Sequence, residues 1–478
     1  MNKSIRNTAI FSLILIVILL VNLSWIQVFQ EEKYAENNHN RRQFLKLKSM
    51  PRGQISAGGI VLARSNKDED GYYHREYVTN PIAYGPVEGY ISDVYGSAGI
   101  EKSYNDILNG TDSSLLSSQW WDALTGKEAS GASIELTLNP AMQETAYNEL
   151  ASRNYQGAVV SIRPSTGEIL AMASTPSYDP SPIVDPATAE ETMTQLNQDP
   201  DSPLLNHATQ EILPPGSTFK VITTAAALQK NYTPDSQVTA ASEITLPGTN
   251  VTLENYGGQS CGSGATTTLI DAFAKSCNTA FVEMGVDIGA EALTETAQAF
   301  GVEDSYDFGL PVEKGGIGDI EDAAARGQSS IGQRDVRMSV LHNAVVAATV
   351  ANGGMRMEPF VVKRILRSDL SELRATKTKE MGQAISPEIA AQLTEMMRSS
   401  ERAMPGGTNH LASKTGTAEH GEDSRNSNPH TWYIAFNPDA DVAVAVVVKN
   451  GGDRGQAATG GSVAAPIGHA VLNAAQGQ

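Results

Sequence analysis

The sequence is short of positive charge. It has 35 lysine and arginine residues against 54 aspartate and glutamate residues, which gives a formal net charge of −19 at pH 7. A protein that binds nucleic acid needs clustered basic side chains to neutralise phosphates, and no basic stripe of this kind is present. The composition therefore argues against a nucleic-acid partner, and the acidic surplus by itself indicates only a soluble surface.

Charge of either sign is missing from residues 8–29. A helix of this length covers roughly the 30 Å of a bilayer core. The run has no Ala-x-Ala site of the kind at which a secretory signal is cleaved, and Trp25 suits a membrane interface. We expect a retained signal anchor, with a cleaved signal peptide as the alternative. Because Lys3 and Arg6 precede the run, the positive-inside rule predicts a single-pass protein of the cell membrane whose remaining chain lies on the extracytoplasmic side.

Cysteine is scarce too, since the chain contains only Cys261 and Cys277. In an oxidising compartment two cysteines can pair. A disulfide that closes a loop of this size would contribute about 3 kcal/mol in the chain-entropy model. Compartment and even number favour the disulfide, and two unpaired buried thiols are the alternative.

The length of 478 residues predicts two or three domains. We expect a cytoplasmic tail over residues 1–7 and the anchor over 8–29. A polar stalk with a small non-catalytic domain should follow over 30–150, and a larger domain over 151–478.

The pattern of the larger unit predicts strands at both of its ends and helices between them. We expect a strand over 132–139, a helix over 140–153 that starts with proline, and a hairpin over 157–174. Residues 217–400 are predicted to be mostly helical, with one helix over 338–354 that stops at a glycine pair. Two strands over 430–450 and a closing helix over 461–476 complete the unit. This order favours an α+β fold with one sheet whose edges come from distant parts of the sequence.

The stretch "LPPGSTFKVI" places Ser217 three residues before Lys220 at the start of an uncharged helical run. Residues i and i+3 share a helix face, so the hydroxyl and the amine can meet. Burial lowers the pKa of a lysine, and a neutral amine beside a hydroxyl is a general base beside a nucleophile. A capped helix with a lysine that reaches to solvent is the alternative.

Two further motifs favour the catalytic interpretation. Ser276-Cys277-Asn278 and Lys414-Thr415-Gly416 follow Ser217 in the chain. Ser-x-x-Lys, Ser-x-Asn and Lys-Thr-Gly occur in this order in penicillin-binding proteins and class A β-lactamases. Ser-x-Asn alone is a weak signal, since it occurs four times here, but only the copy at Ser276 lies between the other two motifs.

Each motif residue has a chemical role. Ser276 can relay a proton, and Asn278 can donate to a substrate carbonyl or hold the lysine. The stretch "HLASKTGTAE" predicts a strand, and Gly416 would let a peptide approach its edge. Lys414 offers positive charge to a substrate carboxylate, with hydroxyls from Thr415 and Thr417. The backbone N–H groups of Ser217 and Thr417 would form the oxyanion hole.

The chain resembles a class B penicillin-binding protein, a peptidoglycan DD-transpeptidase, over nearly its whole length. Besides the three motifs, "RGQI" (52–55), "GAVVSIRPSTGEILAMASTPSYDP" (157–180) and "SPLLNHA" (202–208) carry the resemblance. The short first domain is most similar to the penicillin-binding protein A group of actinobacteria. The resemblance implies a transmembrane helix, a small mixed pedestal domain, and a penicillin-binding, serine β-lactamase-like domain in which helices cover an antiparallel sheet.

The resemblance also implies the chemistry. Ser217 would attack the penultimate D-Ala carbonyl of a stem pentapeptide, and the acyl group would pass to an amine of a neighbouring stem. β-Lactams would acylate the same serine, no metal or other cofactor would be needed, and proteins of the division or elongation machinery would be partners. The resemblance further implies a disulfide between Cys261 and Cys277.

Two other functions remain open on the sequence. A β-lactamase or DD-carboxypeptidase would share the motifs, but no carboxylate can be assigned to activate water for deacylation. A non-catalytic receptor or scaffold is the second, although a receptor would normally carry a cytoplasmic signalling domain. A fused glycosyltransferase has no room before residue 155.

Overall fold

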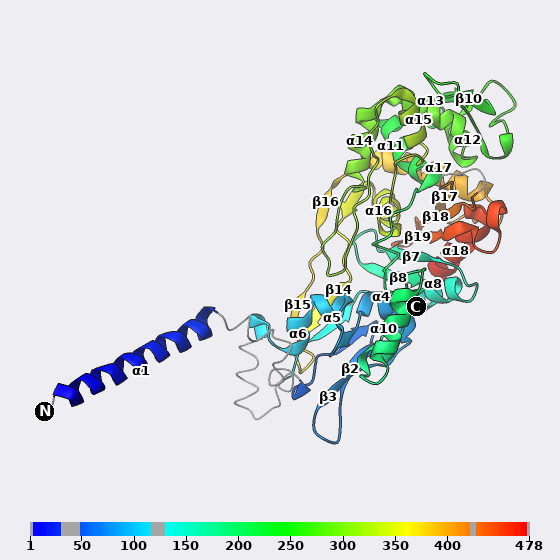
Figure 1. Ribbon diagram of the computed structural model, residues 1–478. Coiled ribbons are helices and arrows are strands. Elements are labelled where there is room, and N and C mark those ends of the chain that lie inside the picture. Colours follow the sequence, from blue (N-terminus) through cyan, green and yellow to red (C-terminus); the bar gives the residue numbers. More distant parts are fainter. Residues whose placement is uncertain (1–2, 30–47, 116–129, 421–426, 476–478) are drawn as a thin grey trace.

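The computed structural model describes residues 3–29, 48–115, 130–420 and 427–475. Helix α1 (Lys3–Phe29) stands apart from the remaining elements (Figure 1). Its segment Ile5–Trp25 is, among the described residues, the one helix long and apolar enough to cross a membrane. The helix begins before the predicted span at residue 8 and so includes Lys3 and Arg6. Most of the predicted stalk, residues 30–47, lies outside the described residues.

A six-stranded sheet forms the part of the molecule that follows α1 in the chain (Figure 1). Its order is β15-β14-β6-β1-β2-β3, and β1 pairs parallel with β6 while the other pairs are antiparallel. The strands are β1 (Ile55–Ala57), β2 (Ile60–Lys67), β3 (Tyr73–Tyr77), β6 (Ser133–Leu136), β14 (Val362–Leu366) and β15 (Glu372–Ala375). Two of the six strands therefore come from the second half of the chain, so this sheet is built by both predicted domains.

Short elements and a buried ion cluster complete this region. The elements are α4 (Pro81–Glu88), β4 (Ile91–Ser92), β5 (Gly96–Ser97), α5 (Gly99–Ser103), α6 (Asn105–Asn109) and η1 (Ser113–Leu115). The fully buried Glu101 carboxylate accepts hydrogen bonds from Arg52 Nε at 2.6 Å and from Arg75 Nε at 2.5 Å. These bonds join the start of the sheet to β3 and α5, because the three residues lie on different segments.

A five-stranded antiparallel sheet forms the centre of the larger unit, with the order β17-β18-β19-β7-β8. Its strands are β7 (Gly157–Ile162), β8 (Ile169–Thr175), β17 (Ala412–Ala418), β18 (His430–Asn437) and β19 (Val442–Val448). The predicted hairpin and the two late strands are confirmed, and β19 pairs with β7 across the chain. Strands β17 and β8 are the two edge strands of this sheet.

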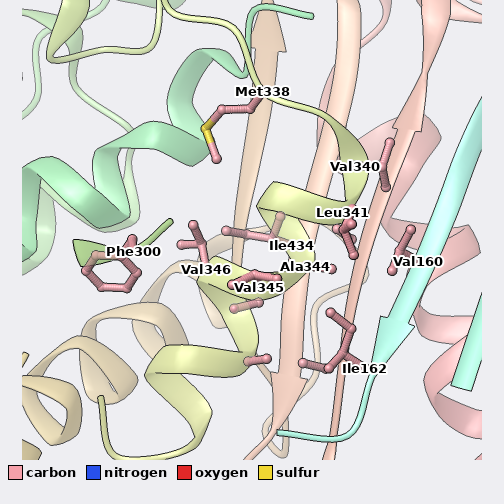
Figure 2. Packing of buried hydrophobic residues seen from close by; sticks show 14 of the residues in the cluster. Val160, Ile162, Phe300, Met338, Val340, Leu341, Ala344, Val345, Val346 and Ile434 are labelled. Carbon is pink, nitrogen blue, oxygen red and sulfur yellow. The ribbon is translucent and has the colours of Figure 1, made fainter. Parts of the chain in front are cut away.

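Helices cover both faces of the central sheet. On one face, α8 (Pro140–Ala151) and α18 (Ala465–Ala474) pack in a cluster that includes Tyr433. On the other face lies α16 (Val340–Ala351), whose apolar side chains meet Val160, Ile162 and Ile434 of the sheet (Figure 2). The predicted helices over 140–153, 338–354 and 461–476 are thus confirmed, and they bury the sheet from both sides.

A mostly helical region lies beyond the β17 end of the sheet (Figure 1). Its helices are α11 (Lys220–Gln229), α12 (Leu269–Ala274), α13 (Asn278–Ile288), α14 (Ala290–Ala299), α15 (Ala323–Ser329) and α17 (Pro387–Ala403). Helices α9 (Ser181–Val184) and α10 (Ala189–Gln198) lie instead near the six-stranded sheet, where α9 contacts β3 and β4 (Figure 1). Small strand pairs are β9 (Gln237–Thr239) with β12 (Thr266–Thr268), β10 (Glu243–Thr245) with β11 (Thr252–Glu254), and β13 (Met355–Met357) with β16 (Glu380–Gln383). The α+β prediction, with helices inserted between the strands of one sheet, is confirmed.

Candidate active site

The turn that carries Ser217 is fixed from two sides. Residues Gly216–Phe219 form the 3₁₀ helix η2 directly before α11. Trp432 Nε1 donates to the carbonyl of Pro214 at 3.0 Å, and the N–H of Gly216 donates to the carbonyl of Gly332 at 2.9 Å. Gly216 has φ +55°, a conformation that glycine adopts without strain. The half-buried Ser217 is therefore held at the N-terminus of α11, against the central sheet.

Lys220, the first residue of α11, is fully buried. Its Nζ donates to the Ser276 carbonyl at 2.7 Å and to Asn278 Oδ1 at 2.8 Å, and it lies 3.3 Å from Ser276 Oγ. Burial, and then the nearby charge of Lys414, lower the pKa of Lys220 well below its ordinary value. The predicted direction of this shift is confirmed, so the amine loses its proton far more readily than an exposed lysine.

The structure corrects one detail of the expected geometry. No hydrogen bond joins Lys220 Nζ to Ser217 Oγ in the described part of the chain, because the amine is drawn to the two oxygens of the Ser276 motif. In a 3₁₀ turn, however, residues i and i+3 lie on the same side. Ser217 and Lys220 therefore remain stacked along one edge of the turn.

Ser276 joins the two lysines. Its Oγ accepts a hydrogen bond from Lys414 Nζ at 2.9 Å and lies next to Lys220 Nζ. Its backbone has φ +59°, a left-handed conformation that is uncommon for a residue other than glycine and is often found at functional sites. Asn278, the first residue of α13, accepts from Lys220, while its Nδ2 donates to the carbonyl of Glu254 at 3.2 Å. Asn278 thus holds the lysine, one of the two roles that the sequence suggested.

Lys414 is also fully buried. Besides Ser276 Oγ, its Nζ donates to the carbonyl of Thr415 at 3.1 Å. Burial lowers the pKa of Lys414 to about 7. The group can therefore be charged or neutral near neutral pH, and it is connected to Lys220 through a single hydroxyl.

The Lys-Thr-Gly motif lies on β17, as predicted, and this edge strand leaves one side without a partner in the sheet. Gly416 has a second reason to be glycine. A Cβ at this position would approach the carbonyl of Pro215 to 2.7 Å and Cβ of Trp432 to 3.1 Å. The absent side chain therefore makes room for the turn that carries Ser217. Thr417 Oγ1 accepts from the N–H of Gly460 at 3.4 Å, and Thr415 is half-buried on the same strand.

Cys261 and Cys277 form a disulfide, and their Cα atoms lie 6.1 Å apart. The bond ties the loop after β11 to the residue between Ser276 and Asn278. Asn255 supports the same junction, because its Oδ1 accepts from the N–H of Thr279 at 3.0 Å. The predicted disulfide is confirmed, and the Cys277 side chain is used for this cross-link.

Two phenylalanines that the sequence analysis did not select complete the site. Lys220 Nζ lies 5.2 Å from the centre of the Phe281 ring, and Lys414 Nζ lies 5.7 Å from that of Phe273. Both rings are buried and exclude water from the amines. Their positions shortly before and after the Ser276 motif were the only sequence signal. In the described ranges no group of three or more His, Cys, Asp and Glu side chains could hold a metal ion.

Two histidines and two aromatic residues outside the three motifs have structural contacts. His342 forms a capping box with Ser339 at the start of α16, and His207 Nδ1 lies 2.9 Å from Glu211 Oε2. Trp432 and Tyr433 are fully buried in β18. In the described part of the chain, none of the four forms a hydrogen bond with Lys220 or Lys414. The site consists of residues from η2, α11, the Ser276 turn, α13 and β17.

Comparison with known families gives the class of the protein. Residues 157–473 match the family described as penicillin binding protein transpeptidase domain. Residues 52–134 match the family described as penicillin binding protein A dimerisation domain. The first match covers more than half of the chain, so this chain belongs to the penicillin-binding protein transpeptidases.

Individual relatives narrow the comparison. The chain is 46% identical to peptidoglycan D,D-transpeptidase PbpA of Mycolicibacterium smegmatis, over 99% of both chains. It is 44% identical to the protein of the same name from Mycobacterium tuberculosis, again over 99% of both. The solved ceftriaxone acyl-enzyme complex of penicillin-binding protein A from M. tuberculosis matches with a TM-score of 0.87 and 45% identity, over 90% of this chain and 99% of that one. The penicillin G acyl-enzyme complex matches with a TM-score of 0.86 and 46% identity, over 89% and 100%.

Proposed function

We propose that this chain is a serine-type peptidoglycan D,D-transpeptidase that β-lactams acylate. The observation that supports this most is the hydrogen-bond network beside the edge strand β17. In it, Lys220 bonds to Ser276 and Asn278, and Lys414 bonds to Ser276. The relatives named above are D,D-transpeptidases, and both of the solved structures named above are β-lactam acyl-enzymes. The substrate would be the D-Ala-D-Ala end of a stem peptide.

Ser217 is the proposed nucleophile and Lys220 its general base. A neutral amine has two N–H groups and one lone pair. The two shortest contacts of Lys220 Nζ go to the Ser276 carbonyl and Asn278 Oδ1, which can only accept. These two bonds use both N–H groups and leave the lone pair to take the Ser217 proton.

The acylation step then balances as follows. Ser217 Oγ forms a bond to the carbonyl carbon of the penultimate D-Ala, and its proton passes to Lys220. The N–H groups of Ser217 and Thr417 are proposed to stabilise the oxyanion. When the intermediate collapses, the C–N bond breaks and the terminal D-Ala leaves as an amine. That amine takes the proton from Lys220 through the hydroxyl of Ser276.

The second half-reaction forms the cross-link. An amine of a neighbouring stem attacks the ester carbon, the bond to Ser217 Oγ breaks, and the proton of the attacking amine returns to the serine through Lys220. Lys414, Thr415, Gly416 and Thr417 of β17 are proposed to bind the substrate peptide and its carboxylate, because an edge strand can pair with an extended chain.

We propose a domain arrangement together with this function. Residues 1–7 would lie in the cytoplasm, 8–29 in the membrane, and 30–150 would separate the membrane from a catalytic domain over 151–478 on the extracytoplasmic side. One apolar helix near the N-terminus and a net charge imbalance before it support an anchor with this orientation. Partners from the division or elongation machinery are proposed on the resemblance alone.

Acylation by a fluorescent penicillin tests the proposal. The full chain in detergent should give a covalent band on a denaturing gel that persists for many minutes. Ser217→Ala should give none, and Ser263→Ala, which changes an exposed serine near the disulfide, should label as the unaltered chain does. A band that decays within seconds would instead indicate a hydrolase, and no band in any of the three proteins would indicate a scaffold.

A further inference from the structure

The carboxylate of Glu401 is fully buried behind the catalytic strand and is not part of the site described above. It lies near the end of α17 and accepts four hydrogen bonds. Its Oε1 accepts from the N–H of Thr408 at 3.0 Å and from His469 Nε2 at 2.8 Å. Its Oε2 accepts from Tyr433 OH at 2.9 Å and from Ser413 Oγ. One carboxylate therefore joins the loop before β17, β17 itself, β18 and α18.

The link to β17 falls directly beside the catalytic motif. Ser413 immediately precedes Lys414, and successive strand residues point to opposite faces. Ser413 thus points back to Glu401 while Lys414 points to Ser276. A shift of Ser413 along or away from the sheet would shift Lys414 by a similar amount, because the two share a peptide bond.

The loop before β17 also packs closely against the end of α17, where Glu401 lies. A Cβ on Gly407 would come within 1.8 Å of the Glu401 carbonyl, so the chain passes closely over the end of α17. Strand β17 has a partner in the sheet on only one side. Its position is therefore less constrained by the sheet than that of an inner strand, and hydrogen bonds to a charged acceptor can fix it.

We propose, on the basis of the proposed function, that Glu401 is a positioning residue of the transpeptidase reaction. It acts through Ser413 to hold Lys414 and the edge strand β17 at the distance from Ser276 that acylation requires. Glu401 touches neither Ser217 nor Lys220. Of its four hydrogen bonds, the one to Ser413 serves the chemistry, whereas those to Tyr433 and His469 serve stability.

A matched pair of variants separates these roles. Ser413→Ala and Tyr433→Phe each delete one hydroxyl that donates to the same oxygen, Glu401 Oε2. We expect Ser413→Ala to lower the limiting acylation rate by about tenfold or more, with a smaller effect on the preceding non-covalent binding constant. Tyr433→Phe should change the rate by less than about threefold while lowering the melting temperature. Glu401→Gln should resemble Ser413→Ala if it folds.

The pH dependence of the acylation rate is a further test, because a purely structural role of Ser413 would leave it unchanged. Burial lowers the pKa of Lys220 most, and the neighbouring charge of Lys414 lowers it further. If Lys414 moves away from Lys220 in Ser413→Ala, the pKa of Lys220 should rise. The acid limb of the acylation rate should then move to higher pH. In Tyr433→Phe the limb should stay in place.

Amide hydrogen exchange tests whether Glu401 holds β17 in place, independently of the acylation reaction. The amides of residues 412–418 should exchange faster in Ser413→Ala than in Tyr433→Phe. Unchanged exchange and acylation in Ser413→Ala, or an equal loss of acylation in both variants, would overturn the proposal. The unaltered chain and Ser217→Ala serve as references, so failure of labelling in the unaltered chain would reject the enzyme assignment, while exchange would still decide the role of Glu401.

Discussion

Asn278 Oδ1 lies 2.8 Å from Nζ of Lys220, at the N-terminus of a helix that follows a left-handed Ser276. Together with the bond to the Ser276 carbonyl, this contact, rather than one with Ser217, fixes the amine. It is made by a neutral amide, so it orients the lysine without adding a charge that would stabilise the protonated form. The charge state of Lys220 therefore depends on the side chain at position 278.

Replacement of Asn278 by aspartate should shift the pH dependence of acylation. A carboxylate beside Lys220 would raise its pKa, which burial and Lys414 hold well below the ordinary value. In the proposed mechanism the neutral amine of Lys220 is the base, so the acid limb of the rate should move to higher pH. We expect Asn278→Asp to lose about tenfold or more in acylation rate near pH 7 and to recover part of it near pH 9. Stopped-flow labelling with a fluorescent penicillin over this pH range measures both effects.

Asn278→Ala is the matched control for this prediction. It removes the same hydrogen bond without adding charge, so its rate should fall while the acid limb does not move upward. If the aspartate and alanine variants had the same pH profile, the electrostatic argument for Lys220 would be wrong.

Replacement of Lys414 by methionine should stabilise the protein while it removes acylation. Burial lowers the pKa of Lys414 to about 7, against 10.5 for an ordinary lysine. The unfolded state therefore binds more protons than the folded state between these values, and this group costs stability that is regained as pH rises. At pH 7 we expect Lys414→Met to raise the free energy of unfolding by roughly 1–2 kcal/mol, since apolar replacements of buried charges are often stabilising.

Thermal unfolding at two pH values measures this effect. The difference between Lys414→Met and the unaltered chain should be larger at pH 7 than at pH 10, where lysine is neutral in the folded protein and partly neutral in the unfolded one. A variant that is less stable at both pH values would show that the hydrogen bonds to Ser276 and Thr415 outweigh the burial of the charge.

Replacement of Glu101 by glutamine should destabilise the six-stranded sheet. Burial would raise the pKa of Glu101, but Arg75 and Arg52 hold it below the ordinary value, so the carboxylate is charged between two buried guanidiniums. Removal of one charge from a buried cluster costs about 3–5 kcal/mol. The exposed pair of Arg64 and Glu76 offers the control, and Glu76→Gln should cost no more than about 1 kcal/mol. Calorimetry of both variants gives the comparison, and equal melting temperatures would contradict it.

Sequence patterns predicted the central sheet well because β7, β8, β18 and β19 are mostly apolar and are bounded by turn residues. The hairpin around "RPSTGE" and the strands around "NPDAD" are local features. Strands β14 and β15 were not predicted as part of the first sheet. Strand β14 lies more than 200 residues from its partner β6, and β15 pairs with β14. No local pattern states which strand a polar, alternating segment will pair with.

The sequence by itself predicted which residues form the candidate site: Ser217 with Lys220 through helical spacing, and the Ser276 and Lys414 motifs through their order. It also determined the apolar helix near the N-terminus. Only the tertiary structure decided that Lys220 turns to Asn278, that Gly416 is small to admit the Ser217 turn, and that Glu401 joins β17 to three other segments. These contacts link residues that lie tens to hundreds of positions apart, and burial, which sets the pKa of both lysines, exists only once those segments pack together.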